Sequence, residues 1–186
     1  CAFCASGLLK KNRNLETHEI VGQVLLMNKL LEVENEKVTH IVVMGTGEPF
    51  DNYDNLMKFI DIVTDQRGLD IGSRHITIST CGILPKIEEY LKRENQNNLA
   101  ISLHASESET RSKLMPINKA YDMMDVIEVI RKSDNIKKKI TFEYIMLDGI
   151  NDTEEDAIRL CKLLDGINCY VNLIPYNETN AGTFKA

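Results

Sequence analysis

The chain has 186 residues, of which 43% are hydrophobic and 27% charged, a balance typical of one globular domain with a sizeable core. Its formal net charge of −6 excludes an overall basic field for attracting nucleic acid, although Lys10, Lys11 and Arg13 form a short basic loop. No apolar run approaches the roughly 20 residues of a membrane-spanning helix, so we expect no membrane partner. The five cysteines are an odd number in a chain too large to need disulfides, which favours a reducing, cytoplasmic setting.

The chain opens with two cysteines three positions apart, in Cys1-Ala-Phe-Cys4. This spacing occurs in redox pairs, zinc sites and iron–sulfur sites alike. Taken alone, it therefore leaves all three alternatives open.

From about residue 16, helical stripes of apolar residues alternate with short apolar runs. The expected helices carry the stripes Ile20–Val24–Met27–Leu31, Leu56–Phe59–Ile60–Val63, Pro85 to Tyr90, Met123–Ile127–Ile130 and Ala157–Leu160–Cys161–Leu164. The expected strands are 40–45, 75–80, 98–104, 139–147 and 170–175. Five strands alternating with five helices indicate an α/β protein with a parallel sheet, closed or partly closed. Cys161 on its apolar helical stripe and Cys169 at the start of a strand are expected to be core residues.

Four of the five expected strands end in glycines or small polar residues. Gly45-Thr-Gly-Glu-Pro49 follows the first strand, Ser79 and Thr80 end the second, Ser102 to His104 end the third, and Asn172 and Asn177 belong to the fifth. Ligands of parallel α/β proteins bind at the carboxyl ends of the strands, so we expect a polar ligand there. No catalytic triad stands out, and a lone histidine such as His104 is more often a structural hydrogen-bonding residue.

Several motifs in order resemble the RlmN/Cfr family of radical-SAM RNA methyltransferases. They are "CAFCASG", "KNRNL", "MGTGEP", "ITISTCG", "ISLHA", "LMPIN", "YIMLDGIND" and "NLIPYN", running from the first residue to about Asn177. The resemblance implies a partial (β/α) barrel of the radical-SAM type, similar to a TIM barrel, that lacks its first strand. It also implies that residues 1–186 form one core domain, truncated at both ends.

The resemblance implies two cofactors, a [4Fe–4S] cluster and S-adenosylmethionine (SAM). The family's cluster loop reads Cys-x-x-x-Cys-x-aromatic-Cys, so Cys1 and Cys4 match two of its three ligands, and the third is expected four residues before Cys1. By the same resemblance, Gly47 and Glu48 contact the methionine amino group of SAM. Ser79, Ser102, Leu103 and His104 contact its ribose and carboxylate, and Asn177 its adenine. Cys81 stands where a serine is expected, and it is assigned no role.

The activity implied is methylation of carbon 2 of an adenosine in 23S ribosomal RNA and in transfer RNA, through a 5′-deoxyadenosyl radical. The methyl-carrying and resolving cysteines would lie outside this chain, so the chain alone is expected to be inactive. The resemblance further implies a cytoplasmic monomer that receives electrons from a flavodoxin-type donor. One alternative is a Cfr-type enzyme that methylates carbon 8 and confers antibiotic resistance. The other is a non-catalytic metal module that binds RNA or a protein partner.

Overall fold

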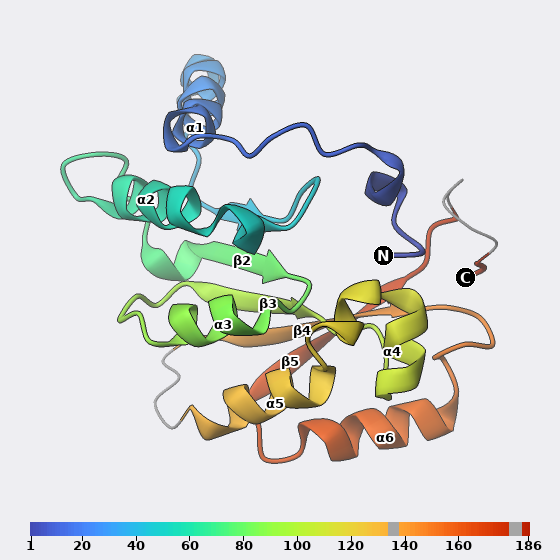
Figure 1. Cartoon of the computed structure of the whole chain (residues 1–186). Helices are drawn as coiled ribbons and strands as arrows, with labels where there is room; N and C mark the ends of the chain where they lie inside the picture. Colours follow the sequence, from blue (N-terminus) through green and yellow to red (C-terminus); the bar gives the residue numbers. More distant parts are fainter. Residues whose placement is uncertain (134–137, 179–183) are drawn as a thin grey trace.

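A computed structural model of the chain describes residues 1–133, 138–178 and 184–186. Its centre is a five-stranded sheet in the order β1-β2-β3-β4-β5, with every neighbouring pair parallel (Figure 1). The strands are β1 (Ile41–Val43), β2 (Ile76–Thr80), β3 (Asn98–Ser102), β4 (Ile140–Met146) and β5 (Cys169–Pro175). All five lie within the predicted ranges or within one residue of them, so the parallel α/β prediction is confirmed.

Six α-helices accompany the sheet. They are α1 (Thr17–Leu31), α2 (Tyr53–Thr64), α3 (Leu84–Leu91), α4 (Ser108–Leu114), α5 (Met123–Lys132) and α6 (Glu154–Leu164). Five of these were predicted and α4 was not, because its seven residues bury only Arg111 and Leu114 and show no apolar stripe. None of the helices within the described residues is long and apolar enough to cross a membrane.

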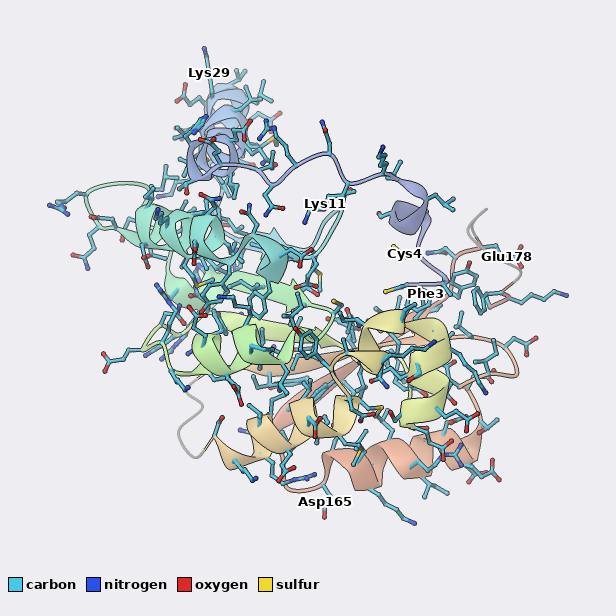
Figure 2. The ribbon with its side chains drawn as sticks, in the orientation of Figure 1. Phe3, Cys4, Lys11, Lys29, Asp165 and Glu178 are labelled. Carbon is cyan, nitrogen blue, oxygen red and sulfur yellow. The ribbon has the colours of Figure 1, made fainter. Side chains whose placement is uncertain are left out.

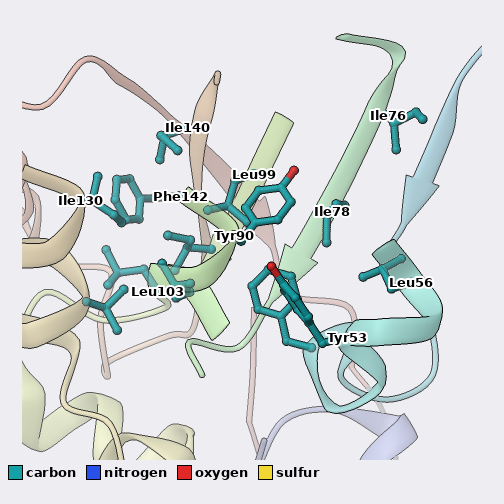
Figure 3. Packing of buried hydrophobic residues seen from close by; sticks show 14 of the residues in the cluster. Tyr53, Leu56, Ile76, Ile78, Tyr90, Leu99, Leu103, Ile130, Ile140 and Phe142 are labelled. Atoms are coloured by element: carbon teal, nitrogen blue, oxygen red, sulfur yellow. The ribbon is translucent and has the colours of Figure 1, made fainter. Parts of the chain in front are cut away.

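The main core lies between one face of the sheet and the helices, and Figure 3 shows part of it. Alternate residues of a strand point to opposite faces, so Ile76 and Ile78 of β2 and Ile140 and Phe142 of β4 face this core. The remaining strand residues form a second face that we call the inner face. Its members in register are Val42, Thr77, Ser79, Asn98, Ala100, Ser102, Thr141, Glu143, Ile145, Tyr170, Asn172 and Ile174. The inner face is therefore mainly polar, although Ala100 and Glu143 are buried in it.

Two apolar stripes are buried less than predicted. In α1 only Val24 is buried, and Met27 is 48% exposed. In α6 the buried residues are Asp156, Leu160 and Leu164, which lie four positions apart on one side of the helix. Cys161 comes one position after Leu160 and is exposed, so its prediction as a core residue was wrong. Cys169 is half-buried and packs against the core, as predicted.

Candidate functional site

The cysteine loop is anchored at the carboxyl edge of the sheet by Phe3. This ring is 8% exposed and belongs to a small apolar cluster with Leu114, Met115, Leu147 and Tyr176. It also meets the His104 ring edge-on, with the ring centroids 5.1 Å apart. In Figure 2, Phe3 and Cys4 lie on the side of the sheet to which the strand arrows of Figure 1 point. The two cysteines therefore lie at the edge where a parallel sheet binds its ligands.

Both cysteines of the loop are free thiols. Cys1 is exposed and Cys4 is half-buried, and the Gly7 N–H donates to the Cys4 carbonyl over 2.9 Å. Two neighbouring thiols at a ligand edge have the chemistry that an iron–sulfur cluster requires. Within the described residues, however, no group of three or more histidine, cysteine or acidic side chains is placed to hold a metal. The loop thus fits a cluster only as the source of two of its ligands.

Glu48 connects the ends of β1 and β2. Its carboxylate accepts hydrogen bonds from the Thr80 hydroxyl over 2.8 Å, the Phe50 N–H over 3.0 Å and the Cys81 N–H over 2.7 Å. Three donors from the protein fix the carboxylate, and its second oxygen, which accepts the Cys81 N–H, keeps acceptor capacity for a ligand. The buried setting of the Cys81 thiol, together with the charge of Glu48, raises its pKa, so this thiol stays protonated.

Gly47, just before Glu48, has a φ of +111°, which side-chain-bearing residues rarely adopt. An added Cβ would meet no atom within 4 Å, so the glycine is required by its backbone conformation and not by crowding. The backbone at this position consequently faces open space, where a ligand can approach it closely.

His104 is a structural residue, and its Nε2 makes no hydrogen bond within the part of the chain that the structure describes. It has a φ of +58°, a left-handed conformation that histidine tolerates better than most residues. Its Nδ1 accepts a hydrogen bond from the Ile145 N–H over 3.0 Å, which leaves the ring proton on Nε2. Burial, helped by the charge of Arg111, lowers the pKa of His104 to about 3. The ring is therefore neutral near pH 7 and presents an N–H donor, and it is not a ready general base.

Arg111 is a site residue that sequence reasoning missed. It is 1% exposed, and its guanidinium donates to the carbonyls of Cys81, Ser102 and Leu103 over 2.7, 2.8 and 3.1 Å. A fourth hydrogen bond, to Asn118 Oδ1, is 2.8 Å long. Burial lowers the pKa of Arg111 to about 10, so the group remains a cation. Arg111 thereby joins the ends of β2 and β3, the two strand ends where Ser79 and Ser102 were predicted to bind a ligand.

The remaining predicted residues lie along the same edge. Ser79 and Ser102 are half-buried on the inner face. Leu103 has a buried side chain, so only its main chain is available to a ligand. Asn177 is exposed and follows β5 by two residues, at the opposite end of the sheet from Gly47. The fold thus orders all the predicted residues along one edge, although no hydrogen bond links Asn177 to the others among the described residues.

A groove of about 650 Å³ opens beside β1. The segment 9–15, α1 and η3 (Pro49–Asn52) line it, together with Gly47 and Glu48. The basic loop on its wall is partly neutralised, since Lys11 pairs with Asp51 and Arg13 with Glu19. Ser79, Ser102, His104 and Asn177 are not among the residues that line the groove, so it meets the row of strand ends only at the end of β1, where Gly47 and Glu48 lie.

Known proteins share both the sequence and this arrangement. Residues 1–161 match the family model of the radical SAM superfamily. A protein of Spiroplasma citri named "Probable dual-specificity RNA methyltransferase RlmN" is 55% identical over 95% of this chain and 52% of its own length. A protein of Staphylococcus aureus with the same name is 50% identical over 96% of this chain and 49% of its own length.

Two solved structures extend the comparison. A radical SAM methyltransferase from Sphaerobacter thermophilus superposes with a TM-score of 0.94 at 39% identity, covering 100% of this chain and 55% of that one. A domain of pyruvate-formate lyase-activating enzyme from Bacteroides vulgatus shares the fold alone, with a TM-score of 0.55 at 18% identity. The chain spans about half the length of the curated relatives it matches. Since the family model matches most of the chain, the chain belongs to the radical SAM superfamily.

Proposed function

We propose that the chain is the radical-SAM core of an RNA methyltransferase that methylates carbon 2 of adenosine in 23S ribosomal RNA and in transfer RNA. The observation that carries this proposal is the identity of 50–55%, over nearly the whole chain, to relatives named as RlmN methyltransferases. The order of the motifs from "CAFCASG" to "NLIPYN" supports the same type. On this proposal, residues 1–186 are one core domain of a cytoplasmic enzyme.

Cys1 and Cys4 are the proposed cluster ligands within the chain. Phe3 holds their loop against His104 and the apolar cluster at the carboxyl edge, which supports a fixed position for the two thiols. A [4Fe–4S] cluster would need its third cysteine from a part of the protein other than the described residues. When bound, the cluster supplies the electron that cleaves SAM to the radical used for methylation.

The row of strand ends is the proposed SAM site. At one end of the row, the methionine amino group would lie beside the open backbone at Gly47. It would donate a hydrogen bond to the second oxygen of the Glu48 carboxylate. The Nε2–H of His104 and the hydroxyls of Ser79 and Ser102 are donors for the carboxylate and ribose in the middle. Asn177 would lie at the adenine end. Arg111 does not contact the ligand in this scheme and instead fixes the main chain of β2 and β3 beneath it.

The substrates and the electron donor follow from the proposed family. An enzyme of this type acts on ribosomal and transfer RNA, receives electrons from a flavodoxin-type protein and works as a monomer. The methyl-carrying and resolving cysteines of such an enzyme are assigned to no residue of this chain.

The test is a methylation assay on the full-length protein, expressed from its complete reading frame and reconstituted anaerobically with iron and sulfide. It would be incubated with SAM, a reductant and unmodified ribosomal or transfer RNA, and the digested RNA analysed by mass spectrometry. We expect 2-methyladenosine from both RNAs. The appearance of 8-methyladenosine would favour the Cfr-type activity, and metal and RNA binding without methylation would favour a non-catalytic module.

A further inference from the structure

The inner face holds a buried carboxylate that has no assigned role in the proposed SAM site. Glu143, in β4, is 7% exposed. Its Oε2 accepts a hydrogen bond of 2.7 Å from the Asn172 amide, in β5. No ion pair is formed by Glu143 in the part of the chain that the structure describes, and no donor from that part reaches its other oxygen. Glu143 is thus a buried acid with one neutral partner and one oxygen to spare.

A structural link between two strands would not require this charge. Burying a carboxylate without a cation is unfavourable, whereas a glutamine could make the same contact with Asn172 at much lower cost. Glu143 is also rigidly held, because its carbonyl accepts hydrogen bonds from the Leu103 and His104 N–H groups over 3.0 and 3.1 Å. A fixed, under-used acceptor in a ligand-binding face is more consistent with a role toward a ligand.

The register of the sheet indicates which part of a ligand would meet this oxygen. Ser102 pairs with Glu143, and Glu143 pairs with Asn172, so the three side chains form one row across β3, β4 and β5. The row is level with the carboxyl end of β3. A SAM molecule with its amino group at Gly47 and its adenine near Asn177 would place its ribose between them, over β3 and β4.

We propose that Glu143 binds the ribose of SAM through hydrogen bonds from the ribose hydroxyls, and that Asn172 holds the carboxylate in place for this contact. This inference rests on the proposed function. A carboxylate can only accept, and vicinal hydroxyls supply two donors, so the pair is matched in chemistry. The sulfonium of SAM is a different possible target for a negative charge, and the experiment below separates the two.

The test compares Glu143→Gln with the wild-type full-length protein, reconstituted anaerobically. Titration calorimetry would measure the affinity for SAM and for S-adenosylhomocysteine, which has the same ribose but a neutral sulfur. We expect Glu143→Gln to weaken both ligands by the same factor, roughly 10- to 100-fold, because a charge-assisted hydrogen bond is lost in each case. The control is Glu88→Gln, an exposed acid on α3, which should leave both affinities unchanged.

A ligand lacking the ribose hydroxyls excludes a merely structural effect. S-adenosylhomocysteine analogues without the 2′- or 3′-hydroxyl should bind the wild type weakly, and for at least one of them Glu143→Gln should cause little further loss. An equal loss of affinity for all ligands, the analogues without a ribose hydroxyl included, would indicate damage to the fold and would overturn the proposal. Unchanged affinities in Glu143→Gln would also overturn it. A loss for SAM alone would assign Glu143 to the sulfonium instead. A wild-type protein that binds no SAM would contradict the proposed function itself.

Discussion

Replacing Arg111 is predicted to destabilise the protein far more than replacing an exposed arginine. In Arg111→Met, the guanidinium is lost, and the carbonyls of Cys81, Ser102 and Leu103 each lose a donor. Asn118 Oδ1 also loses a donor and keeps the Met123 N–H. A buried acceptor left without a partner costs about 1–3 kcal/mol, and such losses within one network are not additive. We therefore expect the free energy of unfolding to fall by about 3–5 kcal/mol, which corresponds to a drop in Tm of roughly 6–20 °C for a chain of this size.

The free energy of unfolding of Arg111→Lys should lie between those of the wild type and Arg111→Met. Lysine keeps the charge but has three donors and no planar fork, so it cannot satisfy all four acceptors. Arg131→Met is the matched control, because Arg131 is exposed and its one hydrogen bond within the described residues is to the Leu163 carbonyl, and we expect a change below about 1 kcal/mol. Urea and thermal unfolding followed by circular dichroism would measure all four proteins. A loss below about 1 kcal/mol in Arg111→Met would show that the four hydrogen bonds of Arg111 do not stabilise the fold.

Three further predictions concern the candidate site. Cys1→Ala and Cys4→Ala should each abolish the iron–sulfur absorbance of the reconstituted full-length protein, and an unchanged spectrum in either would argue against that residue as a ligand. Glu48→Gln should weaken SAM binding roughly 10- to 100-fold in calorimetry, because the charge that faces the ammonium is lost, and wild-type affinity would count against this role. His104 has a pKa of about 3 when folded against 6.5 when unfolded, so below pH 6.5 only the unfolded chain gains the proton and stability decreases as the pH falls. Between about pH 8 and pH 5, the free energy of unfolding in urea should fall by about 2 kcal/mol more in the wild type than in His104→Asn. Equal pH dependence in the two proteins would contradict this prediction.

The sheet and most helices could be predicted because their patterns are local. The run His40 to Gly45 and the stripe Leu56–Phe59–Ile60–Val63 each reflect burial on one side, which the sequence shows directly. The wrong prediction for Cys161 and the missed helix α4 also follow from relying on local patterns. Cys161 lies next to a buried position but points outward, and α4 is short, so in both cases the tertiary contacts decide and the local pattern does not.

The candidate site was predictable only where a residue belongs to a motif. Gly47, Glu48 and the residues 102–104 stand at strand ends, so parallel topology alone brings them to one edge. Arg111 and Glu143 gave no such signal. Arg111 lies in a helix eight residues after Leu103, and three of its four partners are main-chain carbonyls, which no side-chain pattern reveals. Glu143 lies inside a strand, and its importance depends on a register that only the assembled sheet defines.

On the proposed function, the carboxyl ends of the five strands form the SAM site. The most direct test is a crystal structure of the full-length protein, reconstituted anaerobically and bound to SAM. We expect the methionine amino group at Gly47 and Glu48, the ribose over β3 and β4, and the adenine near Asn177. Density for SAM in the groove between the segment 9–15 and β1, away from Ser102 and His104, would contradict this expectation.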